Sequence, residues 1–200
     1  MANQYTVSEF ISNAYALVLT KIFYNKARLI RRPVYLRGKS SLDFGPGLTI
    51  GHGCRFDLPG EGKKTLRIGQ NCEFGDMVHI VAHERVEIGD DCLFASKIFI
   101  SDTEHGNYSG SEPHSGPRTN PRERKLMTRP VKIGERVWLG ENVCILSGVE
   151  VGDGCIIGAN SVVTRNIPAG TIAVGSPAKV IKKWDEQLKN WINLVEISYV

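Results

Sequence analysis

The chain has 200 residues, of which 42% are hydrophobic and 23% charged, and its formal net charge is +4. These values are ordinary for a soluble globular domain with a substantial core. The basic residues are dispersed over four short segments, so the charge fits a small polyanionic ligand or an anionic membrane surface better than nucleic acid. No basic region precedes the first apolar stretch, and that stretch is too short to span a bilayer, so we expect a cytoplasmic protein.

The N-terminal segment, residues 1–32, is predicted to be helical. Apolar residues recur at three- and four-residue steps over residues 8–30, Ser8 is the predicted N-terminal cap with Glu9 as an acid in the first turn, and Pro33 ends the pattern. Basic residues gather toward the end of this segment. Its apolar face has two interpretations: it packs on a neighbouring element or subunit, or it makes peripheral contact with the inner face of a membrane.

From residue 131 onward an aliphatic residue recurs every six positions, often with glycine after it. The aliphatic positions are Ile133, Leu139, Ile145, Val151 and Ile157, and earlier ones are Ile50, Phe56, Ile68, Phe74, Ile88 and Phe94. A helix has a period near 3.6 and a half-buried strand a period of 2, so neither explains this spacing. The hexad predicts an all-β solenoid, a parallel β-helix over residues 33–178 in which glycine turns corners that a side chain would crowd.

Four cysteines each lie four residues after a hexad position: Cys54, Cys72, Cys92 and Cys155. We predict that they stack with Val137 in one inward corner of the solenoid, reduced and unpaired, as small apolar core residues. A linear stack does not converge on one point, so no metal site is expected there.

Two segments depart from the hexad. Residues 101–130 contain none, are rich in Gly, Pro, Ser and Arg, and are predicted to form a long functional loop. After Gly175 and Pro177 the repeat ends, and the spacing of Trp184, Leu188 and Trp191 predicts a short amphipathic helix within a basic C-terminal segment, residues 179–200.

Three segments sharpen the interpretation: residues 101–106 at the start of the long loop, residues 137–140, and residues 173–183 with the pattern Gly-x-Pro-Ala-Lys. Together with the hexads they resemble the left-handed β-helix hexapeptide acetyltransferases, most closely those that O-acetylate bacterial lipopolysaccharide and capsular sugars. The resemblance covers nearly the whole chain. It implies acetyl-CoA as donor, a sugar acceptor, no metal, and a homotrimer with active sites at subunit interfaces.

The resemblance also implies roles for individual residues. His105 matches the general base of the family, although relatives often carry a second histidine where this chain has Thr103. Imidazole suits this role because its pKa is near neutrality. Trp138, predicted to point outward, would line the acyl-transfer site. The residues implied in coenzyme binding are Gly140, Ala159 and Thr164 along the coils and the phosphate-binding Lys179, Lys182 and Lys183.

Acceptor-binding candidates follow from the hexad geometry. His79 is predicted to point outward one coil away from Phe99, which lies just before the long loop. Arg55, Asp57 and Asp76 occupy outward or corner positions and are weaker candidates.

The sequence therefore predicts an acetyl-CoA-dependent O-acetyltransferase that acts on a sugar hydroxyl of a surface polysaccharide or its precursor by direct transfer. N-acetylation of an amino-sugar is the enzymatic alternative, and a β-helical binding or assembly module is the non-enzymatic one. A zinc-dependent carbonic anhydrase on the same fold is disfavoured, because His79 and His83 are four apart where five are needed and no third histidine falls into register.

Overall fold

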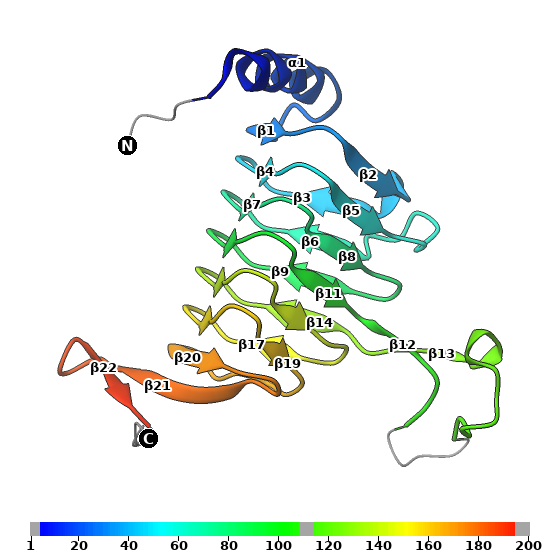
Figure 1. Cartoon of the computed structure of the whole chain (residues 1–200), viewed down its shortest axis with the longest axis vertical. Helices are drawn as coiled ribbons and strands as arrows, with labels where there is room; N and C mark the ends of the chain where they lie inside the picture. The colour runs from blue at the N-terminus through cyan, green and yellow to red at the C-terminus, as the bar shows by residue number, and fades with distance from the viewer. Residues whose placement is uncertain (1–4, 109–113, 195–200) are drawn as a thin grey trace.

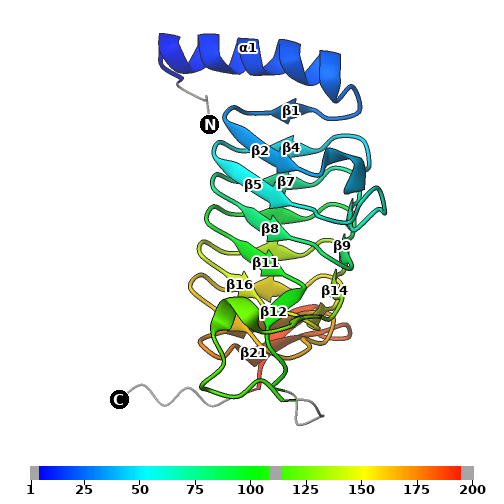
Figure 2. The ribbon, with the colours of Figure 1, turned by 90° about the vertical axis from the view of Figure 1, so that its right-hand side faces the viewer.

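The computed structural model describes residues 5–108 and 114–194. The chain forms a left-handed parallel β-helix, with one α-helix across the N-terminal end of the stack and a β-hairpin leaving the other end (Figures 1 and 2). The predicted fold class is thus confirmed, apart from the C-terminal helix described below.

The helix α1 (Val7–Phe23) begins at a capping box. The N-cap is Thr6 and not the predicted Ser8, because Glu9 at the third helical position completes a capping box with Thr6. The Thr6 Oγ1 accepts a hydrogen bond from the Glu9 N–H at 3.3 Å, and the Glu9 carboxylate accepts one from the Thr6 N–H at 2.8 Å. The helix ends well before the predicted residue 30. Leu29 and Ile30 instead form strand β1 and pair with the next coil, so tertiary pairing overrides the helical spacing.

Three parallel sheets form the three sides of the β-helix. Side A comprises β1 (Leu29–Ile30), β4 (Thr49–Ile50), β7 (Glu73–Phe74), β10 (Leu93–Phe94), β15 (Trp138–Leu139), β18 (Ile156–Ile157) and β20 (Thr171–Val174). Side B comprises β2 (Val34–Arg37), β5 (Cys54–Asp57), β8 (His79–Val81), β11 (Phe99–Ser101), β16 (Cys144–Ile145) and β19 (Val162–Val163). Side C comprises β3 (Leu42–Phe44), β6 (Leu66–Ile68), β9 (Val86–Ile88), β14 (Val131–Ile133) and β17 (Glu150–Val151).

The core is a column of inward residues from all three sides. Phe74 and Phe94 stack with ring centroids 4.7 Å apart. Glycines allow the coils to approach at the corners: a Cβ on Gly89 would lie 2.7 Å from the carbonyl carbon of Gly134 on the next coil. Real Cβ contacts essentially never fall below 3.0 Å, so the glycine after the hexad position is a packing requirement, as predicted.

The cysteine prediction is partly wrong. Cys72, Cys92 and Cys155 are buried in the corner before side A, but Cys54 begins β5 on side B and pairs with Val34. All of them are unpaired thiols. The error arose because Ile50 pairs with Phe74 and not with Ile68. Residues 59–64 add about one repeat length to this coil. The six-residue period is therefore unchanged, but the residues after the insertion lie one side further along the coil than predicted.

The predicted C-terminal helix is also wrong. The segment forms the hairpin of β21 (Lys179–Asp185) and β22 (Asn190–Asn193), in which Trp184 and Trp191 lie 5.4 Å apart. β21 pairs antiparallel with β20, the last strand of side A. An unpaired final strand would expose a row of backbone donors and acceptors, so this pairing protects the edge of the sheet.

The outer surfaces of the three sides differ in chemistry. The outward column of side C is charged with alternating sign: Asp43, Arg67, Glu87, Lys132 and Glu150. Ion pairs join Arg67 to Glu87 at 3.8 Å and Lys132 to Glu150 at 3.3 Å. The outward columns of sides A and B carry large apolar and aromatic residues, among them Leu93, Trp138, Tyr35 and Phe99. Side C is therefore suited to water, and sides A and B to contacts.

Candidate active site

The long loop leaves side B at the end of β11 and projects from the stack (Figure 1). Its two arms pair as the antiparallel strands β12 (Thr103–His105) and β13 (Leu126–Thr128), with the short 3₁₀ helix η2 (Pro121–Glu123) between them. His105 ends β12, opposite Leu126, and is exposed. The Tyr108 hydroxyl donates a hydrogen bond to the His105 carbonyl at 2.7 Å, which fixes the chain immediately after the histidine.

A buried aspartate anchors the base of this loop. Asp102 is completely buried, and its carboxylate accepts hydrogen bonds from the backbone N–H groups of His83, Glu84 and Arg85 at 3.0, 2.7 and 2.8 Å. These donors belong to the corner one coil before the loop. Charge-assisted bonds to a buried carboxylate are strong, and leaving the carboxylate unpaired would be costly. Asp102 therefore fixes where β12, and with it His105, leaves the β-helix.

Sequence reasoning did not find Asp102, although a signal was present. Ile98 and Ile100 are inward residues, and alternation places Asp102 at the next inward position. An acidic residue at an inward position must find hydrogen-bond donors.

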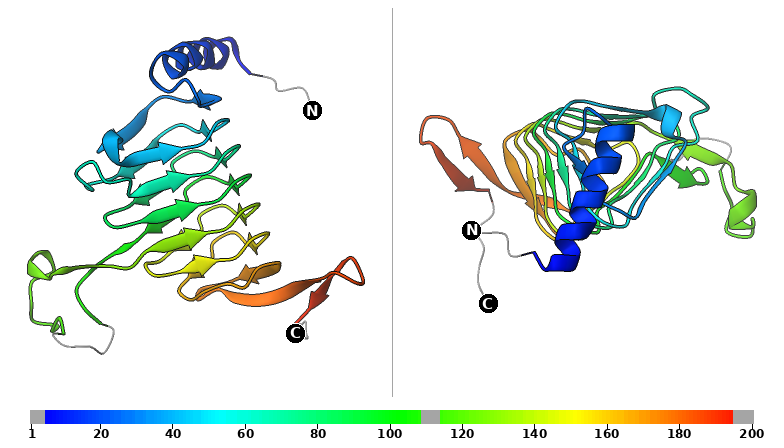
Figure 3. Two further views of the ribbon diagram at one scale, coloured as in Figure 1. Left: turned by 180° about the vertical axis from the view of Figure 1, so that it is seen from behind. Right: turned by 90° about the horizontal axis from the view of Figure 1, so that it is seen from above.

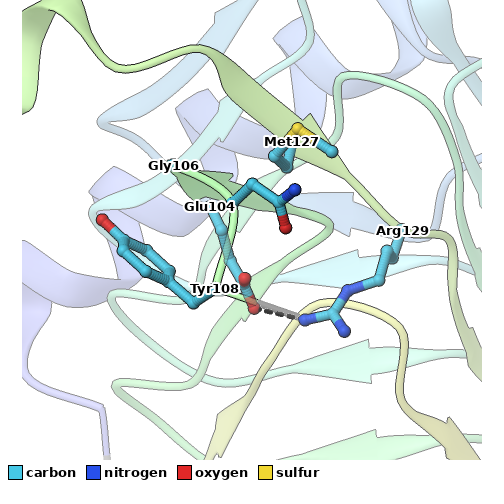
Figure 4. Close-up of a pocket in the computed structure, with 6 residues that line it drawn as sticks. Glu104, Gly106, Tyr108, Met127 and Arg129 are labelled. Carbon is cyan, nitrogen blue, oxygen red and sulfur yellow. Dashed lines mark hydrogen bonds and ion pairs between the residues drawn. The ribbon is translucent and has the colours of Figure 1, made fainter. Parts of the chain in front are cut away.

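The two arms of the long loop form a pocket of about 410 Å³ (Figure 4). It is lined by Glu104, Gly106, Asn107, Tyr108, Met127 and Arg129. Glu104 Oε1 accepts hydrogen bonds from Arg129 Nη2 and Ser147 Oγ, both at 2.6 Å, so it links both arms of the loop to the following coil. This pocket could not be predicted from the sequence, because the residues that line it belong to a segment without a repeat.

The predicted acceptor candidates on side B do come together. His79 Nε2 lies 3.1 Å from Asp57 Oδ2, and Arg55 binds the same oxygen at 2.7 Å. Arg37 reaches the other carboxylate oxygen at 3.2 Å. Burial acts to raise the pKa of the Asp57 carboxyl, but the hydrogen bonds from Arg55 and His79 and the nearby arginine charges outweigh burial and hold this pKa below its ordinary value.

His79 stands where the hexad geometry predicted. It is the register partner of Phe99, and the two rings lie 5.4 Å apart. Asp76 is separate from this cluster: it lies in the corner between sides A and B, where its Oδ1 accepts a hydrogen bond from the His52 N–H at 2.6 Å.

Side A carries Trp138 and the C-terminal lysines. Trp138 is half exposed between the buried Val137 and Leu139, as predicted. The register continues from Trp138 through Ile156 and Ile172 to Lys182 on β21, so these side chains share the outer face of side A. Three strand spacings of about 4.8 Å place Trp138 and Lys182 roughly 14 Å apart.

The other predicted coenzyme-binding residues divide between locations. Lys179 is the partner of Val174 on the outer face, whereas Lys183 is the partner of the buried Thr171 and lies on the opposite face of β21. Gly140 and Ala159 stack in the corner between sides A and B. Thr164 follows β19 at the far end of side B, away from this corner.

His105 and Trp138 come from different sides of the subunit. The loop that carries His105 and the hairpin that extends side A project in opposite directions (Figure 3). Over residues 5–108 and 114–194, no group of three or more His, Cys, Asp or Glu side chains is arranged to hold a metal ion.

The β-helix of hexads is the architecture of the hexapeptide-repeat proteins, and similarity to known proteins narrows the class to transferases. The family model of the bacterial transferase hexapeptide (six repeats) matches residues 130–165. The chain is 44% identical over 191 residues, 96% of each chain, to an Escherichia coli K12 protein named "Putative lipopolysaccharide biosynthesis O-acetyl transferase WbbJ". The protein belongs to the hexapeptide-repeat acetyltransferases and is an acyltransferase.

One further relative and one solved structure are also similar to this chain. The galactoside O-acetyltransferase of Escherichia coli K12 is 34% identical over 126 residues, which are 63% of this chain and 58% of that one. The solved structure of a variant of AntD, an N-acyltransferase from Bacillus cereus, superposes with a TM-score of 0.68 at 21% identity over 94% of both chains. At that identity the AntD structure supports the fold alone.

The Asp102 anchor predicts a specific effect of Asp102→Asn. The amide keeps the shape but turns an N–H group toward backbone donors, so we expect unfolding to become easier by about 1–3 kcal/mol. Hydrogen exchange should show faster exchange at the amides of residues 83–85. The exposed Asp43→Asn is the control and should leave both urea unfolding and this exchange unchanged. Unaltered protection in Asp102→Asn would show that other contacts hold the corner.

Proposed function

We propose that the protein is an acetyl-CoA-dependent O-acetyltransferase that acts on a sugar hydroxyl of a bacterial surface polysaccharide or its precursor. The similarity to the lipopolysaccharide biosynthesis relative, which extends over 96% of both chains, carries this proposal. The exposed His105 on an anchored loop supports it, because acetyl transfer to a hydroxyl needs a general base that solvent and acceptor can reach.

The chemistry is a direct transfer. An imidazole nitrogen of His105 takes the hydroxyl proton while the sugar oxygen bonds to the thioester carbonyl carbon. The tetrahedral intermediate collapses, the carbon–sulfur bond breaks, and the proton passes to the coenzyme thiolate. The products are the acetylated sugar and free coenzyme A, and no acyl-enzyme forms. The pKa of imidazole near neutrality allows both proton transfers at the same group.

The outer face of side A supports a binding site for the donor. Trp138, Ile156 and Ile172 form an apolar column that ends at Lys182. Coenzyme A matches this order, because its uncharged pantetheine arm is followed by negatively charged phosphates. We assign the arm to this column and to the corner of Gly140 and Ala159, and the phosphates to Lys182 and Lys179. A solved structure of a hexapeptide-repeat acetyltransferase from Vibrio cholerae, 23% identical, is complexed with acetyl coenzyme A.

We propose that the active site is completed in a homotrimer. His105 and Trp138 stand on different sides of one subunit, so a site that uses both requires a neighbour. The apolar outer column of side A and the aromatic Tyr35 and Phe99 of side B supply two contact surfaces, and the charged side C is left to solvent. Heterologous packing of one side against another closes into a ring when the rotation is a threefold one.

We assign the acceptor to side B, next to the base of the loop. Arg55, His79 and Phe99 offer hydrogen-bond donors and a ring face, which suit a sugar or an attached phosphate. The AntD structure was solved with an amino-sugar nucleotide, so an amino group is the alternative nucleophile. Parallel assays with hydroxyl and amino sugars decide between O- and N-transfer.

His105→Ala tests the catalytic base. We expect kcat to fall by about 10²–10⁴-fold, the usual contribution of a general base, with the affinity for coenzyme A nearly unchanged. Release of free thiol from acetyl-CoA in the presence of a sugar acceptor measures the rate. His114→Ala, deeper in the loop, should have a smaller effect. Equal losses in both variants, or none in His105→Ala, would assign the base elsewhere.

Subunit mixing tests the shared site. His105→Ala and Trp138→Ala should each be nearly inactive alone. Co-expression should restore thiol release, because a mixed trimer can join the intact His105 of one subunit to the intact Trp138 of its neighbour. Sedimentation of the mixture should show trimers. Mixed trimers without recovered activity would place both residues in separate, single-subunit roles.

The two sides of β21 allow a matched test of the donor site. Lys182→Ala should weaken acetyl-CoA binding by about tenfold, equivalent to about 1.4 kcal/mol. Lys183→Ala, on the opposite face, should change it little. Isothermal titration measures both, and acetyl-pantetheine, which lacks the nucleotide phosphates, should bind the wild type and Lys182→Ala alike. Equal weakening by the two lysine variants would contradict the proposed face.

A further inference from the structure

The helix α1 contacts the β-helix through a narrow strip of small residues. Ala16 and Thr20 are buried, and the Thr20 hydroxyl oxygen accepts a hydrogen bond from the Ile30 N–H of the first coil at 2.9 Å. Arg31 Nε donates to Asn13 Oδ1 at 3.2 Å on the same flank. These contacts fix the rotation of α1 about its own axis.

The opposite face of α1 is apolar and uncovered. Val7, Ile11, Tyr15, Val18 and Ile22 follow steps of three and four residues, so they form one stripe, here called the outward stripe. Every member is more than half exposed, from 58% at Val18 to 78% at Val7. A helix that packs only against its own subunit would direct such residues inward and polar residues outward, which is the reverse of this arrangement.

The charge of the helix and of the segment that follows it is almost entirely positive. Lys21, Lys26, Arg28, Arg31 and Arg32 are the basic residues between positions 5 and 32, and Glu9 is the sole acid there. Glu9 is engaged in the capping box. Lys26 and Arg28 are exposed beyond the end of α1, and neither side chain bonds to a described residue. An apolar stripe beside unpaired cations is complementary to an anionic bilayer surface.

The position of α1 leaves the outward stripe open to such a surface. The helix lies across the end of the stack (Figures 2 and 3). The outward stripe is opposite the buried Ala16 and Thr20, so it points away from the coils. Subunits packed side by side cover sides A and B but not this end. In the proposed trimer, three stripes would face the same plane. No helix of the described residues is long and apolar enough to cross a membrane.

We propose that α1 is a membrane-docking helix that lies flat on an anionic lipid surface, with the outward stripe in the boundary between headgroups and acyl chains and the basic residues against the headgroups. Docking would hold the enzyme where lipid-linked substrates are found. The inference stands on α1 and the basic residues that follow it, and it does not depend on the acetyl-transfer mechanism.

Co-sedimentation of the full chain with vesicles tests whether the outward stripe contacts the lipid. We expect binding to phosphatidylcholine vesicles that contain phosphatidylglycerol and much weaker binding to phosphatidylcholine alone. The double variant Ile11→Gln/Val18→Gln should lose at least about tenfold in affinity, since two apolar side chains leave the lipid boundary. Leu188→Gln removes an equally exposed apolar side chain at the far end of the solenoid and should bind like the wild type. Urea unfolding should be the same for all three.

Charge reversal tests whether the basic residues bind the anionic headgroups. Lys26→Glu/Arg28→Glu should abolish the preference for phosphatidylglycerol, and rising salt should weaken wild-type binding by screening. Lys189→Glu on the C-terminal hairpin is the control for charge and should bind like the wild type. Absence of vesicle binding at low salt would overturn the proposal. So would a loss of oligomer mass in the stripe variant with vesicle binding intact, which would assign the stripe to a second copy of the chain.

Discussion

Register between stacked coils is the constraint on which the rest of this structure depends. Each short strand obtains its backbone hydrogen bonds from the coils before and after it, so the chain must return to the same place on every turn. The corner glycines follow from this close approach, because a Cβ on Gly89 would collide with the next coil. The register also sorts side chains into inward and outward columns. The column of phenylalanines and aliphatic residues inside is the core, and the three outward columns are surfaces whose composition is free to vary.

Because the outward residues can vary without changing the core, the inward columns carry stability and the outward columns can carry function. Side C uses its outward column for alternating charges that suit water, whereas side A presents an apolar column and side B a cluster of Arg55, Asp57 and His79. One backbone pattern thus supports three different surfaces. Since no one side carries both the histidine loop and Trp138, the proposed chemistry depends on assembly as well as on the fold.

The segments outside the repeat lie at the two ends of the stack and in the long loop. The two ends of the stack need covering elements, and α1 and the hairpin of β21 and β22 supply them. The long loop leaves the stack between β11 and β14, and three backbone hydrogen bonds from the neighbouring corner hold Asp102 at its start. A rigid scaffold with one anchored excursion gives an exposed histidine a defined position without a loss of core packing.

The sequence by itself determined the β-helix, the direction of Val137, Trp138 and Leu139, and the pairing of His79 with Phe99, because period and alternation are properties of the local chain. It did not determine the side on which Cys54 lies, since an insertion of one repeat length leaves the period intact. It predicted helix where β1 and the hairpin of β21 and β22 form, because the strand edges with which these segments pair exist only in the folded stack. The cluster around Asp57 and the anchor at Asp102 join residues from different coils, so only the tertiary structure decided their partners.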